Sequence, residues 1–233
     1  MRIRTLLAVA ALTAGLGAAA VARGSENALR IDPTRFSAQV DNPWFPLKPG
    51  TRYVYEGVKD GQRSRDVVFV THQTRTIDGV PCVAVQDRLY LRGRLEERTT
   101  DWYSQDRQGN VWYLGERTAE LDRSGRVTST EGTWLAGVSG AKPGIYMPAH
   151  PTLGQTGRQE YYRGHAEDHF RVIGSFSTVS PAGAPNAVLT QEWTPLEPGV
   201  LDNKLYVRGI GTVLEQTVNG GNERNLLVSV TTG

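Results

Sequence analysis

Residues 99–116 read TTDWYSQDRQGNVWYLGE, and this stretch decides the fold class of the chain. Two runs rich in aromatic and β-branched residues flank the turn sequence DRQGN. A three-residue loop with Gly109 in the left-handed conformation joins two antiparallel strands there, which makes Asp106 and Asn110 the closing pair. The stretch therefore predicts a β-hairpin.

The register of this hairpin places large aromatic side chains on both of its faces. Tyr103 falls opposite Tyr113 on one face, and Ser104 falls opposite Trp112 on the other. Trp102 and Leu114 are expected on the Trp112 face. A strand pair that is apolar on both sides is either covered twice or has one face lining a cavity.

The rest of the chain repeats the same alternation of strand-like runs and turns. Short runs rich in Val, Tyr, Thr and Trp alternate with Gly-containing turns such as KDGQ, RSGR and NGGN. Turn signals at this close and regular spacing are typical of antiparallel strands joined by hairpins. No stretch keeps a helical apolar period. We predict an all-β fold: a single antiparallel meander of about 11–12 strands, forming a curved or barrel-like sheet of lipocalin-like or half-barrel type.

The N-terminus predicts export. Residues 1–22 combine a basic start, an apolar stretch and small residues, which is the pattern of a signal peptide. Residues 23–40 are predicted to be a flexible leader and residues 41–233 a single β domain. No later segment is long and apolar enough for a membrane span. We expect a secreted or cell-envelope protein.

The charge balance argues against nucleic acid as a partner. The chain has 26 Lys and Arg and 24 Asp and Glu residues. Arg2 and Arg4 belong to the predicted signal peptide, so the remainder carries 26 − 2 = 24 basic against 24 acidic residues. A neutral chain has no electrostatic attraction to a polyanion. The oligomeric state is left open.

The familiar enzyme templates are missing. The sequence has no GxSxG nucleophile elbow, no phosphate-binding GxxxxGKS and no GxGxxG. The lone Cys82 lies in an apolar run and is expected to be a buried, inert thiol. Acids such as Glu97, Asp101 and Glu116 are interpreted as a solvated strand face rather than a glycosidase pair. We predict no catalytic residue and no cofactor.

Residues 164–170, GHAEDHF, support the alternative, in which the protein is a metal-dependent enzyme. On a strand, His165, Glu167 and His169 share one face and Asp168 points away, and two neighbours on such a face can bind one metal ion. The cluster could thus serve a metal-assisted hydrolase. The acid that acts as general base in HExxH is replaced by Ala166, and a polar strand end explains the same residues.

Aromatic residues are the other candidate site. Large aromatics can stack on sugar rings or line an apolar cavity, and they also fill wide β cores. The candidates for binding an apolar small molecule or a glycan are Trp102, Tyr103, Trp112, Tyr113, Tyr161 and Tyr162. The leading hypothesis is a non-enzymatic exported protein with such a ligand, and a structural envelope component is the third possibility.

Several motifs together resemble one family. They are DNPWFPLKPGTRYVYEG (41–57), TTDWYSQDRQGNVWYLGE (99–116), TEGTWLAGVSGAKPGIYMPAHP (130–151), RQEYYRGHAED (158–168), TPLEPGV (194–200) and KLYVRGIGTVLE (204–215). They are similar to an uncharacterised family of secreted bacterial β-rich proteins of unknown function. The family pattern reads Gly-Glu-Ala-Glu-Asp around residue 166, so His165 and His169 depart from it while Glu167 and Asp168 match. The resemblance therefore implies a role for the two carboxylates rather than for the histidine pair.

Overall fold

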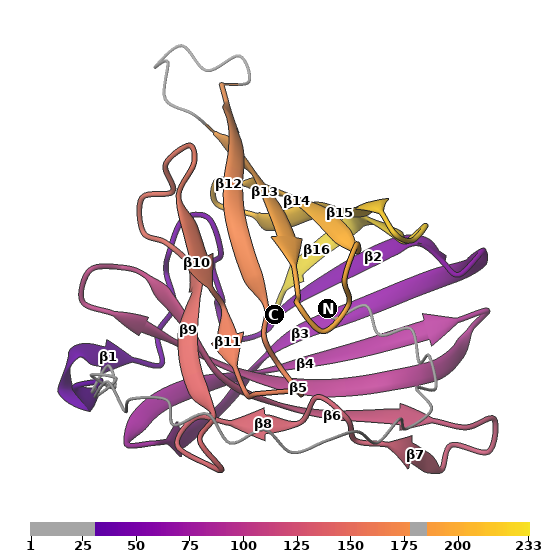
Figure 1. Ribbon diagram of the computed structural model, residues 1–233, viewed down its shortest axis with the longest axis horizontal. Coiled ribbons are helices and arrows are strands. Elements are labelled where there is room, and N and C mark those ends of the chain that lie inside the picture. The colour runs from indigo at the N-terminus through magenta and orange to yellow at the C-terminus, as the bar shows by residue number, and fades with distance from the viewer. Residues whose placement is uncertain (1–30, 178–185) are drawn as a thin grey trace, which may run out of the picture. The chain divides into compact units, whose positions relative to one another are not determined.

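The structure, a computed structural model, describes residues 31–177 and 186–233 (Figure 1). One compact unit runs from Pro33 to Gly233. It is built of β-strands, with a single 3-10 turn, η1 (Pro33–Arg35), among the described residues. None of these residues forms a helix long and apolar enough to cross a membrane. The predicted all-β class is confirmed, and the predicted signal peptide lies outside the described residues.

Sixteen strands make up the sheet. Five of them, each of two or three residues, are β1 (Phe36–Ser37), β7 (Val127–Ser129), β8 (Trp134–Leu135), β10 (Thr156–Arg158) and β11 (Glu160–Tyr161). The longer strands are β2 (Thr51–Lys59), β3 (Gln62–Ile77), β4 (Val80–Leu91), β5 (Arg94–Asp106), β6 (Val111–Leu121), β9 (Lys142–Met147), β12 (His169–Phe176), β13 (Ala187–Trp193), β14 (Leu201–Val207), β15 (Gly211–Asn219) and β16 (Arg224–Thr232). The longer strands account for the predicted meander, and the short ones were not anticipated.

Strands β2 to β5 are joined by tight turns that explain their regular pairing. The turns Asp60-Gly61, Asp78-Gly79 and Arg92-Gly93 all have positive φ at both positions. That geometry is the type I′ turn, whose twist matches the twist of the strands it joins. The hairpins therefore close on adjacent residues, as Lys59 opposite Gln62 shows.

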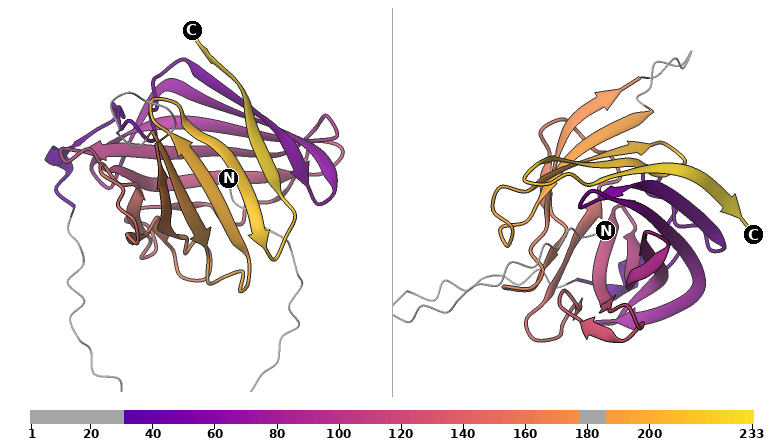
Figure 2. Two further views of the ribbon diagram at one scale, coloured as in Figure 1. Left: turned by 90° about the horizontal axis from the view of Figure 1, so that it is seen from above. Right: turned by 90° about the vertical axis from the view of Figure 1, so that its right-hand side faces the viewer.

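The sheet curls until its two ends meet. The strand order is β10-β12-β13-β14-β15-β16-β2-β3-β4-β5-β6-β9-β11, with β1 beside β5 and with β7 and β8 beside β6. Residues 156–161 form the closing segment: its first half, β10, pairs with β12, and its second half, β11, pairs with β9. Figure 2 shows the long strands curving beneath the orange and yellow C-terminal strands.

The central hairpin has the predicted register near its turn. Tyr103 lies opposite Tyr113, and Ser104 lies opposite Trp112. The Asp106 N–H donates to the Asn110 carbonyl at 3.0 Å, and Gly109 has φ of 89°. Further from the turn a bulge shifts the register, so that Trp102 lies opposite Gly115 instead of Leu114.

Both faces of this hairpin are covered. On the outer face the Phe36 ring packs edge-on against Trp112 at 5.7 Å, because β1 pairs with the end of β5. On the inner face the Phe45 ring packs at 5.4 Å from Tyr103. Residues 33–40, predicted to belong to a flexible leader, therefore include a strand of the sheet.

Candidate functional site

The inner face of the sheet carries a cluster of aromatic rings from β5, β6, β8 and β9. Tyr103 and Tyr113 are stacked, with ring centroids 4.8 Å apart. Tyr146 meets Tyr103 edge-on at 5.1 Å, and Trp134 meets Tyr113 edge-on at 5.4 Å. Phe45 adds a fifth ring, at 4.6 Å from Tyr146. We call these five residues the inner ring cluster.

Two carboxylates lie directly on the inner ring cluster. The Tyr113 hydroxyl oxygen is 2.5 Å from Asp101 Oδ1 and 3.0 Å from Glu116 Oε2, and these two acids face each other across the strand pair. Burial and the charge of Glu116 raise the pKa of Asp101 to about 8. A phenol has one proton to donate, so a proton held by Asp101 satisfies the second contact.

A second pair of acids, Asp66 and Asp87, lies on the neighbouring strands β3 and β4. Asp66 is 3% exposed, and Asp87 is 9% exposed. Burial and then the Asp87 carboxylate raise the pKa of Asp66 well above its ordinary value. Asp87 lies opposite Thr99 on β5, two residues from Asp101, so the two acid pairs are neighbours on the same face of the sheet.

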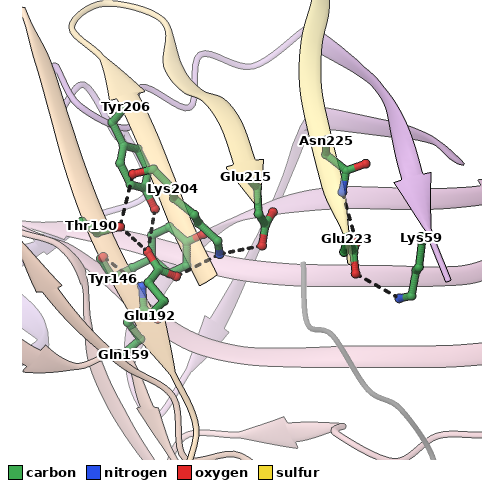
Figure 3. Close-up of polar contacts among 10 residues, drawn as sticks. All are labelled: Lys59, Tyr146, Gln159, Thr190, Glu192, Lys204, Tyr206, Glu215, Glu223 and Asn225. Carbon is green, nitrogen blue, oxygen red and sulfur yellow. Dashed lines mark hydrogen bonds and ion pairs between the residues drawn. The ribbon is translucent and has the colours of Figure 1, made fainter. Parts of the chain in front are cut away.

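On β13 to β15 the inner face holds a buried lysine between two glutamates (Figure 3). Lys204 Nζ lies 2.9 Å from Glu192 Oε2 and 3.4 Å from Glu215 Oε1. Glu192 Oε1 also accepts hydrogen bonds from the hydroxyls of Thr190 at 2.8 Å and Tyr206 at 3.1 Å. Burial lowers the pKa of Lys204, but the two glutamates raise it, and the net pKa is above its ordinary value.

A further ion pair joins β2 to the start of β16. Lys59 Nζ lies 3.9 Å from Glu223 Oε2, and Glu223 Oε1 accepts a hydrogen bond from Asn225 Nδ2 at 3.1 Å. Burial raises the pKa of Glu223 to about 7, although Lys59 acts in the opposite direction. Both buried lysines of the described chain are therefore already paired.

Several buried side-chain atoms have no hydrogen-bond partner among the described residues, and Asp66 Oδ1 and Trp134 Nε1 are the two that lie on the inner face of β3 to β8. Trp134 is 3% exposed and lies opposite Glu116 in the β6–β8 pair. Cross-strand neighbours point to the same side of a sheet, so the indole lies beside the Asp101–Glu116 pair. A buried donor and a buried acceptor without partners are costly, and they are the groups that a polar ligand can satisfy.

The six aromatic residues predicted to bind a ligand do not form one site. Tyr103 and Tyr113 stack on the inner face. Trp102 instead lies under the Arg75 guanidinium, 4.7 Å from its ring centroid. Trp112 donates its indole N–H to Asp106 Oδ2 at 2.9 Å. These two tryptophans belong to the outer face, as their register implies.

Tyr161 and Tyr162 lie at the closing segment and beyond it, apart from the inner ring cluster. The Tyr161 ring is flanked by the cations of Lys142 and Arg158. The Tyr162 ring stacks on His165 at 4.5 Å. Both tyrosines thus have roles in local packing.

The side chains of the GHAEDHF segment each contact a different partner and do not converge on one point. His165 Nδ1 lies 2.9 Å from Glu131 Oε1, whereas the His169 ring stacks on Trp193 at 5.6 Å. Glu167 Oε1 accepts the Gly164 N–H at 2.7 Å, which holds the turn, and the Asp168 backbone carbonyl accepts the Gln159 N–H at 2.7 Å. In the part of the chain that the structure describes, no group of three or more His, Cys, Asp or Glu side chains could hold a metal ion.

Glu97, Asp101 and Glu116 were interpreted from the sequence as a solvated strand face, and the structure corrects this for Glu116, which is buried, and for Asp101, which contacts the Tyr113 hydroxyl on the inner face. The buried charged residues among those described are Lys59, Asp66, Asp87, Glu116, Glu160, Glu192, Lys204, Glu215 and Glu223. The inner face of the sheet was also expected to be apolar, but buried acids and tyrosines share it. Alternation alone could not reveal this, because both faces of β5 and β6 carry aromatics.

Comparison with known proteins finds two solved structures with weak similarity to this chain. No family model and no curated protein matches the chain. A protein from Bacteroides fragilis, described as exported and with a YmcC-like fold, is 14% identical with a TM-score of 0.44, covering 81% of this chain and 99% of its own. One from Parabacteroides distasonis, described as a lipoprotein, is 10% identical with a TM-score of 0.39, covering 82% and 99%. At these values the likeness says nothing about what this chain binds.

Proposed function

We propose that this chain is an exported, non-enzymatic binding protein that holds a glycan on the inner face of its curled sheet. The observation that carries the proposal is the unpartnered indole N–H of Trp134 beside stacked tyrosines and buried acids. Sugar recognition needs such a combination: ring faces for the C–H surfaces, carboxylates that accept from hydroxyls, and donors for hydroxyl oxygens.

Between the two ligand classes expected from the sequence, the polar one is better supported. An apolar ligand would leave the Trp134 N–H and the Asp66 carboxylate oxygen without partners and would also bury them more deeply. A hydroxyl-rich ligand offers both a donor and an acceptor at every carbon that carries a hydroxyl group. The inner face therefore favours a glycan.

The two alternatives have less support. A metal-assisted hydrolase built on His165 and His169 would need these side chains to converge, and each has a separate partner. A structural envelope component would not require the unpartnered polar atoms on the inner face. Export rests on the predicted signal peptide, residues 1–22, and extracytoplasmic location is part of the proposal.

The test is a titration of the purified protein with neutral trisaccharides: maltotriose, cellotriose and triacetylchitotriose. Intrinsic tryptophan fluorescence reports binding, and isothermal calorimetry measures the affinity. Trp134→Phe keeps an aromatic ring, although a smaller one, and removes the N–H donor, so we expect an affinity loss of at least about 2- to 12-fold, the value of one hydrogen bond. Trp112→Phe is the matched control, because its indole already donates to Asp106 on the outer face.

Two results would refute the proposal. If none of the trisaccharides binds at millimolar concentration, or if the two tryptophan variants weaken binding equally, the inner face is not the glycan site. Circular dichroism of both variants separates a loss of binding from a loss of folding.

A further inference from the structure

The charge of the inner face is not balanced. Its buried lysines, Lys59 and Lys204, are committed to glutamates of β13, β15 and the β15–β16 connection. On β3 and β4, by contrast, Asp66 and Asp87 are buried, and neither carboxyl group forms an ion pair with a lysine or arginine of the described residues. Adjacent buried acids without a cation need either protons or a cationic ligand. We call the inner face of β3 to β6, which carries these acids, the acid wall.

Asp66 is the member of this wall that points to a ligand most directly. It is 3% exposed, and its Oδ1 atom has no hydrogen-bond partner among the described residues. Its register partner on β2 is Tyr55 and on β4 is Leu89, so the side chain lies on the tyrosine-bearing inner face. The two carboxyl groups of Asp66 and Asp87 are hydrogen-bonded to each other, which requires a shared proton. An ammonium group has three donors and a positive charge, so it can take the place of that proton between the two carboxylates.

The donor without a partner lies on the same wall. Trp134 is next to Glu116, and Glu116 faces Asp101. Asp87 lies opposite Thr99 on β5, two residues from Asp101 on the same face, which links the β3–β4 acids to the β5–β6 acids. One ligand of a few sugar units can therefore span both, because adjacent strands are only about 4.8 Å apart.

We propose that the glycan carries free amino groups, with Asp66 and Asp87 binding an ammonium group while Trp134 and the tyrosine stack bind a ring. This inference rests on the proposed function and narrows it to a cationic, aminated sugar. A protonated amine on the wall replaces the shared protons that otherwise keep adjacent carboxylates from repelling each other. N-acetylation of the same sugar removes that charge and leaves the ring and its hydroxyls unchanged.

The experiment compares two trisaccharides that differ at their nitrogen atoms, which carry free, charged amino groups in one and neutral acetamido groups in the other. Purified protein is titrated by calorimetry at about pH 6 with chitotriose, which has free amines, and with triacetylchitotriose. We expect chitotriose to bind at least about tenfold more tightly, the effect of a charge-assisted hydrogen bond. Asp66→Asn and Asp87→Asn should each reduce chitotriose affinity by about tenfold or more and leave triacetylchitotriose affinity within about twofold.

The controls separate this inference from the proposed function. Glu56→Gln removes an acid whose side chain is 49% exposed on β2, and it should leave both affinities unchanged. Equal binding of the two sugars, or unchanged chitotriose binding in a folded Asp66→Asn or Asp87→Asn variant, overturns the aminated ligand and leaves glycan binding intact. If neither sugar binds, the aminated ligand is overturned, and the neutral panel decides the proposed function separately.

Discussion

Replacing Lys204 with Met tests whether the buried charges of the inner face stabilise the fold. The side chain of Lys204 is 8% exposed, and those of Glu192 and Glu215 are 8% and 9% exposed. Methionine keeps the aliphatic stem but removes the ammonium group that lies 2.9 Å and 3.4 Å from the two carboxylates. Removing one partner of a buried ion pair typically costs about 3–5 kcal/mol, and we expect a loss of this size near neutral pH.

The dependence of this loss on pH follows from the same geometry. Without the lysine, the two carboxylates bind protons more readily in the folded than in the unfolded chain. A group whose folded pKa is raised contributes stability at low pH that is lost as pH rises. The Lys204→Met variant should therefore lie much closer to the wild type at about pH 5 than at about pH 7.5.

Urea denaturation followed by circular dichroism at the two pH values measures the free energy of unfolding. Arg65→Met is the matched control, because the Arg65–Glu56 pair is about half exposed, with side-chain exposures of 56% and 49%. Loss of a surface pair costs about 0–1 kcal/mol. A loss below about 1 kcal/mol for Lys204→Met, or the same loss at both pH values, would refute the reasoning.

Three further predictions concern the rest of the inner face and the core. Because the pKa values of Asp101 and Glu223 are raised to about 8 and about 7, the folded chain binds more protons than the unfolded chain, so their contribution to the free energy of unfolding should fall between about pH 4 and pH 8, as urea titrations at several pH values would show. Gly144→Ala should lower the melting temperature strongly, since its Cβ would lie 2.1 Å from the Arg158 carbonyl oxygen; a melting temperature within about 2 °C of wild type would contradict this packing. Cys82 is fully buried and burial raises its pKa to about 12, so Ellman's reagent should react with it only after denaturation, and rapid labelling of the native protein would disprove the assignment.

The local part of the fold was accessible from the sequence. The DRQGN turn predicts both the hairpin and the pairing of Tyr103 with Tyr113, because a turn type fixes the register of the strands next to it. The bulge that places Trp102 opposite Gly115 was not predicted, since an inserted residue changes the register without any change in the apolar pattern.

The site was accessible only in part. Tyr103 and Tyr113 were among the six aromatic candidates; Trp134 was not among those six, and the acids Asp66 and Asp87 were not anticipated. Sequence alternation separates two faces of a strand without saying which one becomes the interior, and it carries no information on pairing between distant strands such as β6 and β8. His165 and His169 are close in sequence, but their side chains have separate partners, so the predicted histidine cluster does not form.

The closing segment has a consequence for motion. Only Thr156, Gly157 and Arg158 pair with β12, and only Glu160 and Tyr161 pair with β9, whereas β3 and β4 share a far longer ladder. Breaking so few ladder bonds requires much less free energy than unfolding the long hairpins, so amide hydrogens of this segment should exchange with solvent first. The sheet would then open at the closing segment while β2 to β6 stay paired. This opening would give a lateral entrance for a ligand that is too large to pass between packed strands.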